Sequence, residues 1–305
     1  MNYILTADVG GTKIATALLN EAGVVYAQKI LPSLTENAET MYEQLLLAFQ
    51  YVMNEAGVVE KEVCFIGVGL PGKVDVIRGM AIFQNNLPWR DFPLVSRLQT
   101  NFPTSEITID NDVYMAAKGE WFAHQLKNEL MAFVTISTGI SACFIQKGEV
   151  IRGAGMAGEI GLTYVGCDEK ETLEEKASGT SLTKKSVNRL NLQSKDAVKQ
   201  LMDSFLQGDP LAKEIVTHMT RDMAKGLHQI FCVLDPDIIV LGGGVVNHQP
   251  WLLDFIKKEL QKLVVNPVQS GIEKRLRVSK LKEEAGLLGA SIAVNVRKTG
   301  AINKK

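Results

Sequence analysis

Two segments in different halves of this 305-residue chain carry the same pattern of strands and tight turns. In residues 3–30, three apolar segments are separated first by a Gly-Gly turn and then by a polar turn. Residues 131–151 repeat this order, with Ser137-Thr138-Gly139 at the first turn. The repetition of one supersecondary unit predicts two related halves. Apolar segments that alternate with helical patterns predict an α/β protein.

Apolar spacing also predicts the elements that follow these units. Met41, Leu45, Ala48, Phe49 and Val52 share one face of a helix predicted over residues 38–55. Buried strands are predicted over 63–70, 107–109 and 238–241, and three glycines follow the last of them. No Pro/Ser-rich linker separates the halves. We therefore expect them to pack directly, with a cleft between them where ligands commonly bind.

The composition excludes several classes of protein. Lys and Arg number 33 and Asp and Glu 34, so the net charge is −1. A chain without a basic excess is not expected to bind nucleic acid generally or to lie on a membrane surface. Hydrophobic residues at 46% and charged residues at 22% match a globular protein and not a disordered one.

Neither the apolar runs nor the N-terminus indicates a membrane or secreted protein. The longest apolar-plus-Gly run, residues 238–246, is far shorter than the roughly 20 residues of a membrane helix. The N-terminus lacks the basic start of a signal peptide and reaches a carboxylate at Asp8. No two of the four cysteines have zinc-site or redox spacing, and we expect Cys64, Cys143 and Cys232 to be buried, reduced thiols. These features predict a cytoplasmic protein.

The first turn carries Asp8-Val9-Gly10-Gly11-Thr12-Lys13. Glycines let the backbone approach a phosphate, and consecutive N–H groups can form an anion-binding concavity. Asp8 could hold Mg²⁺ through water. The pattern matches neither a Walker P-loop nor a G-x-G-x-x-G fingerprint. A tight hairpin turn with an aspartate beside it remains the structural alternative.

A second candidate is Asp110-Asn111-Asp112, which ends a predicted strand and begins a predicted helix. Asp112 could act only as the N-cap of that helix. A carboxylate presented at the C-terminal end of a strand is also well placed to act as a general base.

Taken together, these residues resemble the ROK family of sugar kinases, within the actin-like ATPase and hexokinase superfamily. The resemblance covers nearly the whole chain and rests on motifs that occur in the family's order. They are Asp8 to Lys13, Leu70-Pro71-Gly72, Asn86-Leu87-Pro88-Trp89, Asn111-Asp112, Ser137-Thr138-Gly139-Ile140, Ala157-Gly158-Glu159-Ile160-Gly161, Ala177-Ser178-Gly179, Leu241 to Gly244, and Gly286-Leu287-Leu288-Gly289-Ala290.

The resemblance implies a fold of two RNase H-like α/β domains, of the actin and hexokinase type, around a central cleft. We expect the smaller domain to comprise residues 1–112 together with a returning C-terminal helix in 289–305. The larger domain is expected over 113–288. Closure of the two domains on sugar would exclude water that otherwise hydrolyses ATP. The resemblance also implies a homodimer.

The resemblance further assigns a role to individual residues. It implies that Asp112 is the catalytic base, which takes a proton from a sugar hydroxyl as that hydroxyl attacks the γ-phosphate. The implied sugar-binding residues are Gly72, Asn86, Asn111, Asp112, Glu159 and Glu174. The implied ATP-binding residues are Asp8, Gly10, Gly11, Thr12, Thr138, Gly139, Gly242, Gly243 and Gly244. ATP and Mg²⁺ are the expected cofactors.

The chain departs from the family at the usual zinc site. Most members have a histidine after the E-x-G motif and then a cysteine-rich zinc-binding stretch, whereas this chain has Leu162 and only Cys167. Because a structural zinc ion needs four N or S ligands, we expect no zinc, and packing or ion pairs must hold the loop over residues 166–176. Leu162 either fills space beside a free hexose or admits a substituted sugar such as a β-glucoside.

The second phosphate turn also departs from the usual G-T-G-I-G-G-G. Ser137, Ser141, Ala142 and Cys143 occupy the flanking positions. These residues are small, so we expect ATP contacts that are weakened or shifted but not abolished.

Three hypotheses follow for the function. The first is an ATP-dependent kinase that phosphorylates the primary 6-hydroxyl of a hexose or hexoside, of the glucose type or the β-glucoside (cellobiose) type. The second is a catalytically silent sugar sensor, suggested by the altered second turn. The third is a transcription regulator. Regulators of this family carry a helix-turn-helix before the first glycine motif, and that motif begins here at Asp8, so we expect no nucleic-acid partner.

Overall fold

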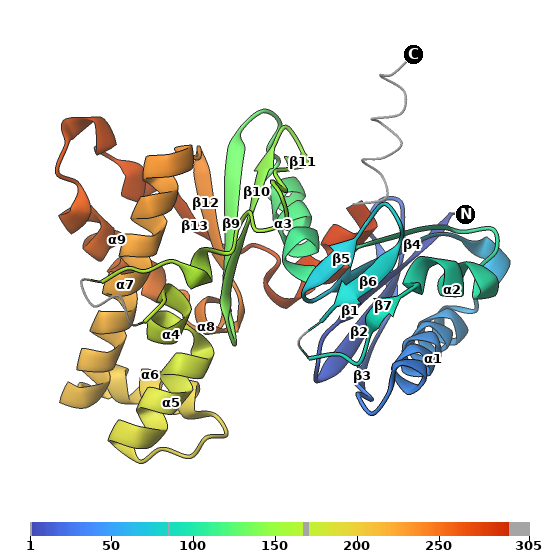
Figure 1. The fold of residues 1–305 in the computed structure, drawn as a ribbon, viewed down its shortest axis with the longest axis horizontal. Helices are drawn as coiled ribbons and strands as arrows, with labels where there is room; N and C mark the ends of the chain where they lie inside the picture. Colours follow the sequence, from blue (N-terminus) through green and yellow to red (C-terminus); the bar gives the residue numbers. More distant parts are fainter. Residues whose placement is uncertain (1, 85, 167–170, 293–305) are drawn as a thin grey trace. The chain divides into compact units, whose positions relative to one another are not determined.

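The computed structural model describes residues 2–84, 86–166 and 171–292. The chain forms two compact units, the first of residues 1–125 with 284–305 and the second of residues 126–283 (Figure 1). The domains predicted from the sequence, residues 1–112 with 289–305 and residues 113–288, stay a prediction. The helix α3 (Asp112–Ala123) belongs to the first unit.

The first unit is built on a five-stranded sheet with the order β3-β2-β1-β4-β8. Neighbouring strands are antiparallel from β3 to β1 and parallel from β1 to β8. The strands are β1 (Tyr3–Val9), β2 (Lys13–Asn20), β3 (Val25–Pro32), β4 (Val63–Leu70) and β8 (Glu106–Asn111). This arrangement brings the ends of β1 and β8, where the sequence places acidic residues, to the same edge of the sheet.

Helix α1 (Ala38–Ala56) packs on this sheet against β2 and β3. It begins where the side chain of Asn37 accepts a hydrogen bond from Thr40 N, and it ends at Gly57 in the left-handed conformation. The five apolar residues that predicted it, from Met41 to Val52, are all buried. Trp89 is fully buried beside it and donates from Nε1 to Ala38 O at 3.1 Å.

Besides these elements, the first unit contains a small sheet, helices α2 and α3, and a C-terminal segment. The sheet has the order β5-β6-β7, and helix α2 contacts both β6 and β8. Residues 285–292 are helical and belong to this unit. Gly67 leaves no room for a Cβ atom, because the backbone of Ala290 lies against it. The bounds are β5 (Lys73–Asp75), β6 (Met80–Phe83), β7 (Arg90–Phe92) and α2 (Leu94–Asn101).

The second unit repeats the sheet of the first. Its order is β11-β10-β9-β12-β13, again antiparallel from β11 to β9 and parallel from β9 to β13. The strands are β9 (Leu130–Ile136), β10 (Ile140–Gln146), β11 (Glu149–Val150), β12 (Ile238–Gly242) and β13 (Leu276–Val278). The duplication predicted from the two turns is therefore present in the strand topology.

The helices of the second unit pack around the long helix α7, which contacts α4, α5, α6 and α9. Asp209 caps α7 and Pro210 occupies its first turn. Short 3-10 helices include η2 (Ile160–Leu162) and η3 (Pro267–Gln269). The helices are α4 (Leu173–Ala177), α5 (Gly179–Leu190), α6 (Ala197–Gln207), α7 (Pro210–Leu234), α8 (Gly244–Asn247) and α9 (Leu252–Leu263).

The cysteine prediction is partly wrong. Cys143 is buried in β10, but Cys64 is only half-buried and Cys232 is exposed. Cys232 lies on the outer face of α7 next to Val233, which is 80% exposed, so an apolar sequence neighbourhood did not mean burial there. Within residues 2–84, 86–166 and 171–292, none of the helices combines the length and the apolarity that crossing a bilayer requires.

Candidate active site

The first glycine turn connects β1 to β2 and is held by several hydrogen bonds. Gly10 N donates to Lys13 O at 2.9 Å, Ser33 Oγ donates to Gly10 O at 2.6 Å, and Ser33 N donates to Thr12 O at 3.1 Å. A Cβ atom on Gly11 would lie 2.6 Å from the Cβ of Asn86. The fold therefore brings a residue predicted to bind phosphate next to one predicted to bind sugar.

Helix α3 begins directly after β8 and places Asp112 in its first turn. Asn111, not Asp112, is the N-cap: its Oδ1 accepts from Val113 N at 3.0 Å and from Tyr114 N at 3.3 Å. Asn111 Nδ2 also donates to Gly72 O at 3.0 Å. Asp112 Oδ1 accepts from Val113 N at 2.9 Å. The alternative in which Asp112 only caps the helix does not match this geometry.

Asp8 and Asp112 lie close enough for their charges to interact. Burial, and then the charge of Asp112, raise the pKa of Asp8 from 3.8 to about 7, although Lys13 acts in the opposite direction. A Cβ atom on Gly286 would lie 2.9 Å from Asp8 Oδ2, so the C-terminal helix also closes on this carboxylate. Two neighbouring carboxylates stabilise each other's protonated form unless a cation lies between them.

This pair fits a divalent cation. Mg²⁺ in phosphoryl-transfer sites is commonly held by one or two carboxylates, with water and substrate oxygens as its other ligands. No group of three or more His, Cys, Asp or Glu side chains suited to a metal occurs in the described residues.

In the second unit, Glu174 joins the second turn to helix α4. Its Oε2 accepts from Ile140 N at 2.7 Å and leaves no room for a side chain at Gly139. The turn itself is closed by Ser137 N, which donates to Gly139 O at 2.9 Å, while Gly179 N donates to Ser137 O at 2.7 Å. Gly139 is thus required by the carboxylate beside it.

Glu159 precedes η2 and lies near Glu174. Burial of its carboxyl group and the charge of Glu174 raise the pKa of Glu159. Gly158, before it, has φ 98° and lies against the backbone of Ala142 in β10, so no other residue fits there. Each unit therefore contains a carboxylate whose pKa is raised by burial and by a second carboxylate nearby, Asp8 in the first unit and Glu159 in the second.

The second unit also contains a hollow of about 1060 Å³, called the larger hollow below. Its size suits a nucleotide-sized ligand, and it lies among α5, the start of α6, and α8. Its lining residues are Ser137, Thr138, Gly179, Thr180, Thr183, Lys184, Val187, Asn188, Ser194, Asp196, Ala197, Val198, Lys199, Gly244, Val245, His248 and Gln249.

Three glycines predicted to bind ATP lie at and after the end of β12, and only one of them lines the larger hollow. Gly244 lines it and has open space around its Cβ position. Gly242 lies against the ring of Phe133, and Gly243 has φ 83° with Ile136 O 2.5 Å from its Cβ position. Gly242 and Gly243 are therefore required by packing against β9.

A smaller hollow of about 480 Å³ lies next to the larger one. Its lining residues are Thr138, Glu171, Glu174, Glu175, Ser178, Thr180, Ser181, Lys184, Lys185, Asn188 and Arg189. Residues of α5 line both hollows. The three that line both, Thr180, Lys184 and Asn188, belong to none of the motifs, so they could not be identified from the sequence.

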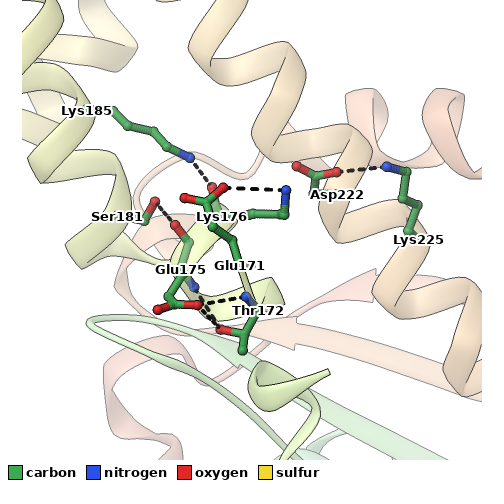
Figure 2. A network of polar contacts seen from close by, with 8 residues as sticks. All are labelled: Glu171, Thr172, Glu175, Lys176, Ser181, Lys185, Asp222 and Lys225. Atoms are coloured by element: carbon green, nitrogen blue, oxygen red, sulfur yellow. Dashed lines mark hydrogen bonds and ion pairs between the residues drawn. The ribbon is translucent and has the colours of Figure 1, made fainter. Parts of the chain in front are cut away.

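Polar contacts hold the described part of the loop that replaces the family's zinc-binding stretch (Figure 2). Thr172 and Glu175 form a capping box at α4, and Lys176 Nζ lies 3.6 Å from Glu171 Oε2. Lys185 Nζ donates to Lys176 O at 2.6 Å, and Ser181 Oγ donates to Glu175 O at 2.6 Å. The expectation of ion pairing in this loop is confirmed for these residues. Cys167 lies outside the described residues.

Comparison with known proteins agrees with the sequence resemblance. The ROK family profile matches residues 4–297. A glucokinase of Halalkalibacterium halodurans is 28% identical over 94% of this chain and 93% of its own length. A protein assigned as a xylose repressor in Caldicellulosiruptor sp. (strain Rt8B.4) is 27% identical over 95% of this chain and 77% of its own length.

Among solved structures, a ROK family glucokinase from Streptomyces griseus, in complex with glucose and AMPPNP, is 25% identical. It superposes with a TM-score of 0.79 over 95% of this chain and 98% of its own. The predicted fold class, with α/β domains of the actin and hexokinase type, is confirmed.

Proposed function

Because the chain belongs to the ROK family, we propose that it is an ATP-dependent sugar kinase. The reaction transfers the γ-phosphate of ATP to the primary 6-hydroxyl of a hexose or hexoside, with glucose as the first candidate. The observation that carries this proposal is the placement of Asp112, in the first turn of α3 and close to Asp8. Sugar kinases among the family's members and a nucleotide-sized hollow support it.

Asp112 is the proposed catalytic base. Its Oδ1 accepts the N–H of Val113, which fixes the carboxylate at the helix start. A base held in this way takes the proton from the sugar hydroxyl, a contribution of about 10²- to 10⁴-fold in rate. Phosphoryl transfer needs little other covalent chemistry from a protein, since positioning and charge neutralisation do most of the work.

The proposed sugar ligands are short polar side chains from both units. In the first unit they are Asn111, bonded to Gly72 O, and Asn86, which lies against Gly11. In the second unit they are Glu159 and Glu174. Such groups accept or donate bonds to hydroxyls, and they reject analogues that lack the matching hydroxyl.

For ATP, we propose that Thr138 and Gly244 contact the nucleotide in the larger hollow, and that Gly10, Gly11 and Thr12 offer backbone N–H groups to phosphate. When bound, Mg²⁺ would neutralise phosphate charge, and Asp8 is its proposed protein ligand. The residue types present fit that role.

The test is an assay of ADP release with Mg²⁺-ATP and a panel of glucose, mannose, fructose, N-acetylhexosamines and cellobiose. We expect turnover with glucose to exceed the release of ADP without sugar. If no sugar in the panel is phosphorylated, the proposal fails. ATP binding without turnover would instead favour a sugar sensor.

One observation favours a β-glucoside as the second candidate substrate. Leu162, which stands where most family members have histidine, is 53% exposed, so it does not fill the core. It ends η2, three residues after Glu159. An exposed apolar side chain next to a residue proposed to bind sugar is better suited to contact a substituent on the sugar than to contact a free hydroxyl. A kcat/KM for cellobiose or methyl β-glucoside above that for glucose would support this candidate.

We also propose that the kinase works as a homodimer in the cytoplasm. The homodimer follows from the family resemblance, and the cytoplasmic location from the sequence features given above. Light scattering coupled to size exclusion at several concentrations tests the oligomeric state, and a monomer at all of them would contradict it.

A further inference from the structure

A ridge on helix α5 separates the larger hollow from the smaller one. Thr180, Lys184 and Asn188 recur at a spacing of four residues and line both hollows. Thr138, from the second turn, is the other residue that lines both. Thr180 N donates to Thr138 O at 3.3 Å, which ties the start of the ridge to that turn. The boundary between the hollows thus combines a turn proposed to bind phosphate with a lysine.

The other basic residues of the smaller hollow already have partners. Arg189 pairs with Glu214 through two hydrogen bonds of 2.9 and 3.1 Å. Lys185 donates to Lys176 O at 2.6 Å, and burial lowers the pKa of Lys185 (Figure 2). Within the described ranges, Lys184 has no hydrogen bond and no ion pair. Its charge acts at a distance on Glu175, whose carboxylate is bonded to Thr172.

The lining of the larger hollow includes apolar residues as well as polar and charged ones. Val187, Ala197, Val198 and Val245 are apolar and suit the faces of a nucleobase. Thr138 and Lys184 are polar or charged and lie at the boundary with the smaller hollow. A nucleotide whose base contacts the apolar residues would extend its phosphates toward this boundary.

We propose that Lys184 binds the β- and γ-phosphates of ATP and is the main protein cation for them in the second unit. The inference rests on the proposed nucleotide site and adds a residue to it. A lysine suits this position because its ammonium group is a compact charge on a flexible stem, able to follow a phosphate chain. Because Lys184 has no ion pair with the residues that the structure describes, none of those residues loses a partner when phosphate binds.

The experiment measures binding of AMP, ADP and AMPPNP with Mg²⁺ by calorimetry, without sugar. For Lys184→Ala we expect about tenfold weaker binding of AMPPNP, a smaller loss for ADP and less than about twofold change for AMP. Lys184→Arg should keep most of the AMPPNP affinity. The matched control is Lys195→Ala, which removes the same charge from a residue that lines neither hollow, and it should change none of the three.

An equal loss for AMP and AMPPNP, or no loss for either, overturns the proposal. Wild-type protein that binds none of the three nucleotides overturns it as well. If the wild type binds AMPPNP through Lys184 but phosphorylates no sugar, the proposed kinase function fails and the assignment of Lys184 stands. The two failures are therefore distinguishable.

Discussion

The two units share one sheet topology but differ in what they carry at the end of the central strand. β1 and β9 are each followed by a three-residue turn and an antiparallel strand. One residue before its end, β1 has Asp8, whereas β9 has Thr135 at the same place. In the first unit Asp8 thus forms an acidic pair with Asp112 at the end of the central strand. In the second unit the corresponding turn lies beside a hollow lined by helices, and the acidic pair, Glu159 and Glu174, lies outside the central strand. Duplicated folds can divide one reaction between halves of different chemistry.

The strongest test of this difference replaces the proposed base of the first unit. Asp112→Asn should lower kcat by about 10²-fold or more, because an amide does not accept the hydroxyl proton. The amide oxygen can still accept from Val113 N, so the thermal unfolding temperature should stay near that of the wild type. Steady-state kinetics and a melting curve measure the two effects. Activity close to wild type would remove Asp112 from the mechanism.

The next test concerns the glycines after β12 in the second unit. Gly243→Ala should destabilise the protein by about 1–3 kcal/mol or more, since a positive φ and the Ile136 carbonyl both oppose a Cβ atom. Gly244→Ala is the matched control, because nothing lies within 4 Å of its Cβ position. Denaturant unfolding compares the two. Equal stability of both variants would contradict the packing role of Gly243.

A third test asks whether the acidic pair of the second unit, Glu159 and Glu174, has a different kinetic role from the pair of the first unit. Glu174→Gln removes the charge that raises the pKa of Glu159 and weakens the bond from Ile140 N. We expect the KM for sugar to rise about tenfold and kcat to change less. Kinetics over a pH range should show Glu159 titrating at lower pH in the variant. A pure loss of kcat would contradict a positioning role for Glu174.

The smallest expected effect is a pH dependence of stability in the first unit. The pKa of Asp8 is 3.8 in the unfolded chain and about 7 in the fold, so the folded protein holds a proton between these values. This stabilising contribution is complete below the lower value and is lost as pH rises through 7. Nucleotide-free wild type should therefore lose about 2 °C more in melting temperature than Asp8→Asn between about pH 6 and pH 8. Parallel losses would show that Asp8 titrates normally.

Much of the fold could be predicted from the sequence, because the spacing of apolar residues indicates which segments form buried strands and helices. The strand Val63–Leu70 and the helix from Ala38 match the predicted ranges closely, and the three strands from Tyr3 to Pro32 match the three apolar segments of residues 3–30. The exposure of Cys232 could not be predicted, since it depends on which face of α7 packs against the neighbouring helices.

The site residues also divide into those that could be predicted from the sequence and those that could not. Motif residues such as Asp8 and Glu174 could be named in advance, and the structure gives each a definite environment. That Asn111 caps α3 in place of Asp112 depends on where β8 ends. Lys184 could not be found, because a lysine on an amphipathic helix looks like any solvated surface residue until the hollows beside it are known. Its chemistry lies in its tertiary surroundings.

The loop ahead of α4 has a further consequence for tolerance to mutation. A tetrahedral metal site needs its full set of ligands, so the loss of one ligand disables the whole. The described contacts of this loop are separate: the Thr172–Glu175 capping box, the Lys176–Glu171 pair and the Lys185 bond each act alone. Each single substitution should therefore destabilise the loop only partially. During evolution, successive substitutions can change its conformation gradually, without an intermediate in which the whole loop is unfolded.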